Sequence, residues 1–238
     1  PDSVSPDEAK AMIAAEPGMA GSDFVSAVSP QEPIEHPGDG PHVVAIDTGI
    51  KSSIVNQFLL RGARVTLLPS TATPEDVTGR DPDLIFLANG PGDPAAVAGV
   101  VETIRELVGV KPMVGICLGH QLLSRAVGLE TFKLPFGHRG SNHPVKDLGT
   151  GISELTSQNH GFAVVAPGGD RTIDTDEPVR WETEFGQAEL THINLYDRTV
   201  EGLNLPDARA MTVQHHPEAG PGPHDARHLF DRFLDLAG

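Results

Sequence analysis

Residues 114–121 read VGICLGHQ, and the rest of the chain is organised around this stretch. It contains the only cysteine, Cys117, framed by Gly115 and Gly119. Apolar residues precede it, and a helix-like run follows over residues 122–127. The order of strand, tight turn and helix is typical of a nucleophile elbow, in which the reactive side chain stands at the tip of the turn. The pattern predicts Cys117 at such a tip, next to a helix N-terminus that favours the thiolate.

A lone cysteine is often only a small buried apolar residue, so a catalytic reading needs a base elsewhere in the chain. Residues 214–218 read QHHPE and provide it. His216 is followed by Glu218, and the proline between them stiffens the backbone. A cysteine nucleophile needs a histidine to take its proton and a third group to orient that histidine. The two stretches together predict a triad of Cys117, His216 and Glu218.

Composition limits the class of protein. The chain has 238 residues, of which 38% are hydrophobic and 5% aromatic, so an aliphatic core of one large domain is expected. A formal net charge of −16 argues against nucleic acid and anionic membranes as partners. A single cysteine excludes an internal disulfide, and we expect a reducing, cytoplasmic setting. No apolar run reaches the roughly 20 residues that a membrane helix needs.

The chain divides near residue 40. Residues 1–40 contain a possible short helix over 7–15 and a stretch rich in proline, glycine and acids over 29–40. This composition predicts a linker or tail, or equally a connector from an upstream domain. Residues 41–238 form the predicted domain.

Short apolar runs alternate with helix-like segments through the first half of this domain. The predicted strands are 43–46, 64–68, 84–88 and 112–116, and the predicted helices are 52–60 and 97–108. This alternation predicts an α/β fold, a doubly wound and mostly parallel sheet with helices on both faces. Active sites of such sheets lie at the carboxyl ends of the strands, where Cys117 is expected.

Three loops carry further candidate residues. Residues 89–94 read NGPGDP, an ordinary turn or, with Gly90 and Gly92, a loop that can aim backbone N–H groups at an oxyanion. Residues 134–145 read LPFGHRGSNHPV and crowd His138, Arg139 and His143 into a glycine loop. Residues 167–187 are acidic and predict a solvated loop or hairpin whose role the pattern does not indicate.

Beyond these loops, we expect a strand over 152–156 that leads into SQNHGFAV, paired strands over 190–195 and 199–203, and a strand over 210–213. A last helix is predicted over 226–236, capped by Asp225. The 11 histidines include possible ligand spacings at His215–His216 and at His224–His228, but there is no second cysteine and no H-E-x-x-H motif. We therefore expect no metal site.

The motifs GICLGHQ, NGPGDP, SQNHGF and QHHPE together resemble those of class I glutamine amidotransferases. More narrowly, PFGHRGSNHPV and HHPEAGPGPHDARHLFDRF are similar to the family of small, glutamine-hydrolysing chains of carbamoyl phosphate synthetase. The resemblance covers residues 42–238, and residues 1–40 resemble the segment that joins this domain to the family's N-terminal domain, which is missing here.

The resemblance implies a role for each matching residue. Cys117 would attack the glutamine carboxamide, His216 would act as base and then acid, and Glu218 would hold His216. The oxyanion hole would be formed by backbone N–H groups of Leu118 and of Gly90 or Gly92. The glutamine α-amino and carboxylate groups would be held by Gln121, Asn159, Gly161 and Phe162.

The resemblance also implies partners. Ammonia would pass to a large synthetase chain, in a heterodimer, for carbamoyl phosphate synthesis in the arginine and pyrimidine pathways. ATP, magnesium and bicarbonate would serve that large chain, and this chain itself would need no cofactor. Two alternatives stay open: a stand-alone γ-glutamyl hydrolase, and a binding or regulatory module that is inactive by itself or depends on its partner.

Overall fold

The computed structural model describes residues 4–16 and 18–238, and these residues form one 11-stranded mixed sheet. Its first half is parallel, with strands in the order β3, β2, β4, β5 and β11. The bounds of these strands are β2 (His42–Asp47), β3 (Arg64–Pro69), β4 (Leu84–Leu87), β5 (Met113–Ile116) and β11 (Ala210–Val213). Both faces of this half are covered, which explains why its strands are continuous apolar runs. The predicted α/β fold is confirmed.

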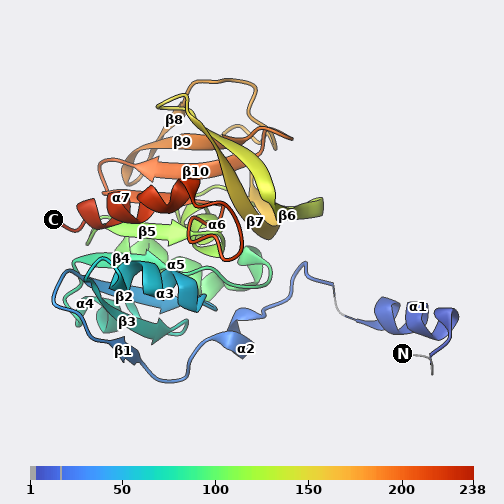
Figure 1. Ribbon diagram of the computed structural model, residues 1–238, viewed down its shortest axis with the longest axis horizontal. Helices are drawn as coiled ribbons and strands as arrows, with labels where there is room; N and C mark the ends of the chain where they lie inside the picture. Colours follow the sequence, from blue (N-terminus) through green and yellow to red (C-terminus); the bar gives the residue numbers. More distant parts are fainter. Residues whose placement is uncertain (1–3, 17) are drawn as a thin grey trace.

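The second half of the sheet is antiparallel and continues from β11 through β10, β9, β6 and β7, with β8 paired to β9. Its strands are β6 (Thr131–Asp147), β7 (Ser153–Val164), β8 (Val179–Thr183), β9 (Gly186–Asn194) and β10 (Val200–Leu205). In Figure 1, β8, β9 and β10 lie above the parallel strands, and β6 and β7 form a long twisted ribbon to their right. The paired strands predicted near residues 190 and 200 are confirmed as β9 and β10.

Helices cover the parallel half on both faces. One face carries α3 (Ser52–Leu59) and the C-terminal η2 (Asp225–His228) and α7 (Leu229–Asp235). There Phe58 packs edge-on against Phe86 and Phe230, with ring centroids 5.1 and 5.3 Å apart. The other face carries α4 (Pro74–Thr78), η1 (Pro94–Ala96), α5 (Ala98–Leu107) and α6 (Leu118–Ala126). None of the helices formed by residues 4–16 and 18–238 has the length and apolar character needed to cross a membrane.

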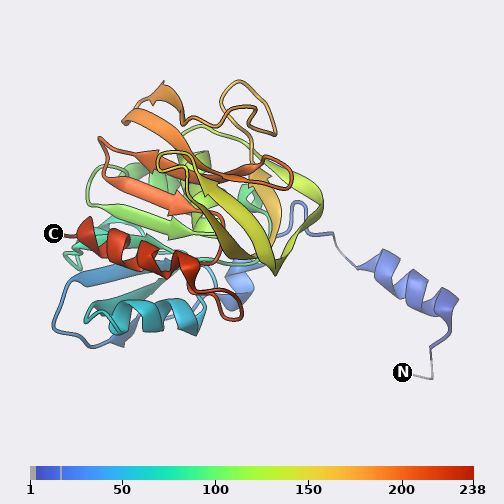
Figure 2. The ribbon, with the colours of Figure 1, turned by 45° about the horizontal axis from the view of Figure 1, so that its top comes forward.

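The N-terminal segment is only partly separate from the domain. Helix α1 (Pro6–Ala15) begins at a capping box of Ser5 and Glu8 and buries no residue, and it projects away from the body in Figures 1 and 2. Farther along, α2 (Val25–Val28) buries Val25, and β1 (Ile34–His36) pairs with β3 and forms the edge of the sheet. Residues 18–40 therefore lie against the domain, whereas the proposed origin of residues 1–40 as a linker from another domain stays a prediction.

Two local predictions differ from the structure, and the prediction of a loop or hairpin over residues 167–187 is confirmed in part. Residues 134–145, expected as a glycine loop, belong to β6, which accommodates its glycines through register shifts opposite β7. The acidic residues 167–187 include β8, so this segment is in part a hairpin with β9. Asp225 is not the cap of the last helix, because it lies inside η2 and α7 begins only at Leu229.

Candidate active site

Cys117 stands at a strained turn between β5 and α6. Its φ of 56° and ψ of −102° are unusual for a residue with a side chain, and strain of this kind persists where surrounding contacts impose it. Two contacts impose it here. The Cys117 N–H donates to the Val213 carbonyl at 2.9 Å, and Gly119 lies so close to β4 that a Cβ atom there would be 2.2 Å from the Leu87 carbonyl oxygen. The structure therefore contains the predicted elbow, and the close approach of residue 119 to β4 explains why that residue is glycine.

His216 approaches the elbow because β11 is the parallel neighbour of β5. Val213 pairs with Ile116, so the residues that follow the two strands emerge at the same edge of the sheet. The His216 N–H donates to the Ser157 carbonyl at 2.9 Å, which fixes the backbone between the elbow and β7. The imidazole Nδ1 donates to the Glu218 Oε1 at 2.8 Å and leaves Nε2 for the Cys117 sulfur.

Four side chains influence one another electrostatically at this site: Cys117, His216, Glu218 and Lys51. Burial by itself lowers the pKa of His216, but the Cys117 sulfur and the Glu218 carboxylate outweigh it and raise the pKa to about 10. An imidazole with a raised pKa can accept the proton of a neighbouring thiol, as a Cys–His pair requires. Burial raises the pKa of Glu218, but His216 and Lys51 lower it to about 2. The Lys51 ammonium donates to the Glu218 Oε1 at 2.8 Å and to the Gly220 carbonyl at 3.2 Å.

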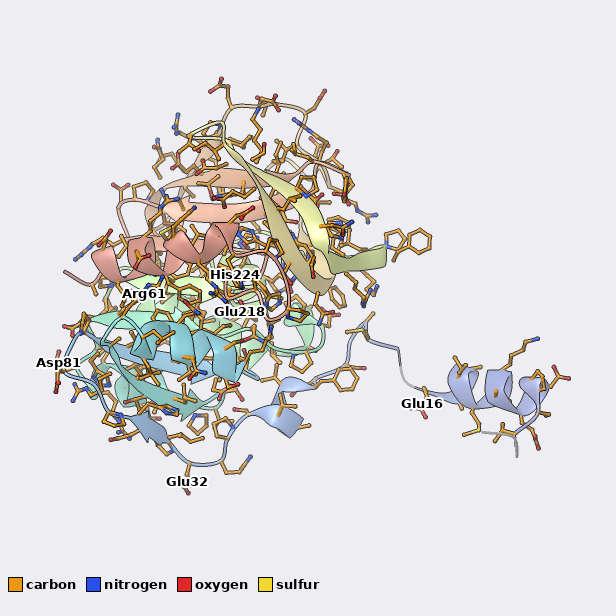
Figure 3. All side chains as sticks on the ribbon, viewed as in Figure 1. Glu16, Glu32, Arg61, Asp81, Glu218 and His224 are labelled. Carbon is orange, nitrogen blue, oxygen red and sulfur yellow. The ribbon has the colours of Figure 1, made fainter. Side chains whose placement is uncertain are left out.

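Lys51 was not among the residues predicted from the sequence. It lies just before α3, 167 positions away from Glu218, and no local motif marks it. The side chain of Glu218, labelled in Figure 3, is completely buried, so a cation is needed to compensate for its charge. The only sequence signal for the role of Lys51 is its position shortly after the carboxyl end of β2.

A pocket of about 630 Å³ opens in front of the sulfur. Most of the predicted site residues line it: Cys117, His216, Gly90, Gly92, Gln121, Asn159, Gly161 and Phe162. Leu118 and Glu218 are not part of this lining and lie behind it, Leu118 at the start of α6 and Glu218 beneath His216. Lys51 and Arg139 bring positive charge to the pocket, and the described residues that line it include no Asp or Glu.

The loop 89–94 is held close to the elbow. A Cβ atom on Gly90 would lie 2.1 Å from the Thr48 carbonyl oxygen and 2.8 Å from the Leu118 side chain, so only glycine fits. Gly92 adopts a φ of +97°, a conformation that favours glycine. Asn89 fixes the loop by accepting a hydrogen bond from the Lys51 N–H at 3.1 Å. The loop is therefore preorganised beside Cys117, as an oxyanion hole requires.

The wall opposite the loop is the end of β7. The Gln121 amide donates to the Phe162 carbonyl at 2.8 Å and to the Gln214 side chain at 2.9 Å. Both hydrogens of that amide are thus used within the protein, and its oxygen is left for a ligand. Asn159 is exposed on this wall and Gly161 lies beside it.

A buried polar cluster supports this wall from behind. Glu201 is fully buried and accepts hydrogen bonds from Gln158 at 2.8 Å and from Asn194 at 2.9 Å. His138 donates to Asp197 at 2.7 Å and lies 3.6 Å from Glu201. Burial lowers the pKa of His138, but Asp197 and Glu201 overcome this and raise it to about 9. His138, His160 and Glu201 are close enough to hold a metal ion, but their polar atoms already have hydrogen-bond partners.

With this geometry established, comparison with known proteins defines the class. Residues 44–236 match the model of the family "Glutamine amidotransferase class-I", and the chain belongs to that family. Solved structures support the fold: a candidate GMP synthase subunit from Thermoplasma acidophilum has a TM-score of 0.66 at 15% identity, covering 85% of this chain and 95% of that one. A glutamine amidotransferase from Thermotoga maritima has a TM-score of 0.52 at 16% identity, covering 76% and 77%.

Within the family, the chain is similar to proteins named carbamoyl phosphate synthase small chain. The one from Chlorobaculum tepidum is 47% identical over 95% of this chain and 59% of its own length. The one from Streptomyces avermitilis is 46% identical over 98% of this chain and 61% of its own length. The chain thus spans about three-fifths of the length of these curated relatives.

Proposed function

We propose that the chain hydrolyses glutamine to glutamate and ammonia through a thioester on Cys117. One observation carries the proposal: the strained elbow presents a sulfur to an imidazole whose other nitrogen is held at 2.8 Å by a fully buried carboxylate. A Cys–His pair oriented by a third group is the arrangement that activates a thiolate nucleophile.

In the proposed reaction, the sulfur attacks the side-chain carboxamide of glutamine. The negative charge that develops on its oxygen is met by backbone N–H groups of Leu118 and of the Gly90–Gly92 loop. His216 gives its proton to the departing nitrogen, and ammonia leaves. A water molecule, deprotonated by His216, then cleaves the thioester and releases glutamate. These steps use only side chains, backbone and water.

The substrate backbone would lie against the β7 wall. Gln121 and Asn159 provide amide oxygens for an α-amino group, and Arg139 and Lys51 provide positive charge for an α-carboxylate. A pocket without carboxylates in its lining suits an amino-acid substrate whose carboxylate is negatively charged.

We further propose that the ammonia passes to a large synthetase chain that makes carbamoyl phosphate for the arginine and pyrimidine pathways. The support is the similarity to carbamoyl phosphate synthase small chains, whose name indicates a second chain. ATP, magnesium and bicarbonate would be used by that partner in a heterodimer.

The test is glutamate release from glutamine by the purified chain, with and without an added large chain. Cys117→Ala should reduce the rate to background under both conditions. Full activity in Cys117→Ala would overturn the proposal. γ-Glutamyl dipeptides should be measured in parallel, because faster cleavage of these by the isolated chain would favour a stand-alone γ-glutamyl hydrolase. Activity that appears only with the large chain would identify a partner-dependent enzyme.

A further inference from the structure

A second, smaller pocket lies on the antiparallel side of the catalytic base. It has a volume of about 90 Å³ and is lined by residues from β6, the turn after it, β7, β9, the segment after β11 and the C-terminal helices. Its polar lining residues are Asp147, Thr150, Glu154, His192, His215, His228 and Arg232. None of them takes part in the proposed reaction, although His215 immediately precedes the catalytic base.

His215 is the unusual member of this set. It is only 1% exposed, and within residues 4–16 and 18–238 neither of its ring nitrogens has a hydrogen-bond partner. Leaving a buried polar group unpaired costs about 1–3 kcal/mol, so such a group indicates a missing ligand. Its Nδ1 faces the buried Glu201 carboxylate at 3.8 Å, which leaves Nε2 for the pocket.

Two neighbours, His192 and Asp147, each have one polar atom held by hydrogen bonds, while the other makes only ion-pair contacts longer than 3.5 Å. His192 has its Nδ1 hydrogen-bonded to the Thr191 hydroxyl at 2.8 Å, which leaves Nε2 3.8 Å from the Asp147 Oδ2. Asp147 accepts hydrogen bonds from Gly149 and Thr150 through Oδ1 alone, at 2.8 and 3.1 Å. Metal-binding histidines characteristically have their second nitrogen oriented by a carboxylate or another polar group.

We propose that this pocket binds a divalent transition-metal ion such as Zn²⁺ through His192 Nε2, His215 Nε2 and Asp147 Oδ2. The His228–Glu154 pair at the rim, 2.8 Å apart, offers a fourth ligand. Imidazole nitrogens with a carboxylate form a donor set that suits zinc and its neighbours in the first transition row.

The charges of the pocket favour a cation over an anion. Asp147 and Glu154 carry negative charge, and an anion would have to approach both of them. Arg232 is the one opposing group, at 3.7 Å from Asp147 Oδ2, and its half-exposed side chain can turn toward solvent. The His192 and His215 ring centroids are 6.1 Å apart, and the ligand atoms of His192, His215 and Asp147 do not all lie within 4.8 Å of one another, so these side chains must rotate toward each other when the ion binds.

The proposed site differs from the expectation, drawn from the sequence, of no metal site. The sequence showed possible ligand spacings at His215–His216 and at His224–His228 but no further ligands, because His192 and Asp147 are brought near His215 only by the antiparallel half of the sheet. An ion held there would join β6, β9 and the segment that carries His216, so it would stabilise the backbone of the catalytic base.

The experiment uses the full chain carrying Cys117→Ala, because the catalytic thiolate and His216 could themselves take up a transition metal. Chelator-treated protein is titrated with Co²⁺ by visible absorbance and with Zn²⁺ by calorimetry. We expect one equivalent to bind, and the affinity to fall about tenfold or more in Asp147→Asn and in His215→Phe. Asp147→Asn can keep both turn hydrogen bonds through Oδ1, so it tests ligation with little risk to folding, which circular dichroism verifies.

Two further variants locate the ion. His224→Ala removes an exposed histidine outside the pocket and should leave binding unchanged. His160→Asn dismantles the His138–His160–Glu201 cluster and should also leave it unchanged. No binding up to about 1 mM metal, equal affinity in Asp147→Asn and His215→Phe, or loss of binding in His160→Asn would each overturn the proposal.

Discussion

At the scale of single residues, the site depends on one buried negative charge with cations on two sides. Glu218 is fully buried and lies 2.8 Å from both the His216 Nδ1 and the Lys51 Nζ. A buried carboxylate is stable in its charged form only when it is paired in this way. The pairing sets the tautomer of His216 and holds its proton-accepting nitrogen toward Cys117.

We expect Glu218→Gln to lower kcat about 10²- to 10⁴-fold with little change in KM, because it removes the group that orients the base. Glu35→Gln is the matched control, since Glu35 pairs with Arg80 on the surface at 2.8 Å. The measurement is steady-state glutamate release. An unchanged kcat in Glu218→Gln would show that His216 does not depend on this carboxylate.

Lys51→Met should shift the acid limb of the pH–kcat/KM profile to higher pH. In the native protein the pKa of Glu218 is lowered to about 2, from an ordinary value of 4.5. The contribution of its charged form to activity and stability is therefore present above pH 4.5 and is lost as the pH falls toward 2. Removing the ammonium raises the Glu218 pKa, so this loss begins at higher pH. An acid limb at the same pH in both proteins would contradict the role given to Lys51.

At the scale of secondary-structure elements, the elbow depends on close contact between α6 and β4. A Cβ atom on Gly119 would lie 2.2 Å from the Leu87 carbonyl oxygen, which belongs to the backbone of a central strand and cannot yield. The helix must therefore shift to admit any side chain, and Cys117 would shift with it.

Gly119→Ala should destabilise the protein by roughly 1–3 kcal/mol and lower its activity, because the added methyl group overpacks the joint between α6 and β4. Gly99→Ala is the control: it lies in α5 with no atom within 4 Å of the added Cβ, and it should stabilise by up to about 1 kcal/mol. Urea unfolding measures both. Equal free energies of unfolding for the two variants would contradict this account of the elbow.

The elements also show what the sequence could predict. Strands β2 to β5 and the elbow follow from apolar runs that both faces of a parallel sheet require, and β9 and β10 were anticipated as a pair. The length of β6 was not anticipated. Gly137 and Gly140 suggest a loop in the sequence, but these residues belong to a strand because β7 pairs with them through register shifts. Lys51 and the His192–His215 pocket depend on contacts between distant segments, which local patterns do not contain.

At the scale of the whole molecule, a parallel half supplies the nucleophile and the base, and an antiparallel half supplies the β7 wall. Helix α1 contributes to neither, since it buries no residue. Residues 18–28 do contribute: Met19 lines the active-site pocket, the Gly21 N–H donates to Asp93 at 2.8 Å, and Val25 is 2% exposed.

Deletion of residues 1–16 should accordingly leave the urea midpoint unchanged, because α1 makes no buried contact. Deletion of residues 1–28 should lower the free energy of unfolding by about 2 kcal/mol or more, since it removes the apolar contacts of Val25 and the bond to Asp93. The two truncated proteins are compared by urea unfolding. Equal midpoints would show that residues 18–28 do not stabilise the domain.

The central claim is that Cys117 becomes covalently bonded to the substrate acyl group. Acid quenching of the protein during glutamine turnover, followed by mass spectrometry of its peptides, tests this directly. We predict a γ-glutamyl adduct on the peptide containing Cys117, absent from Cys117→Ala and accumulating in the native protein only when glutamine is present. Glutamine turnover with no adduct on that peptide, or with the adduct on another residue, would contradict it.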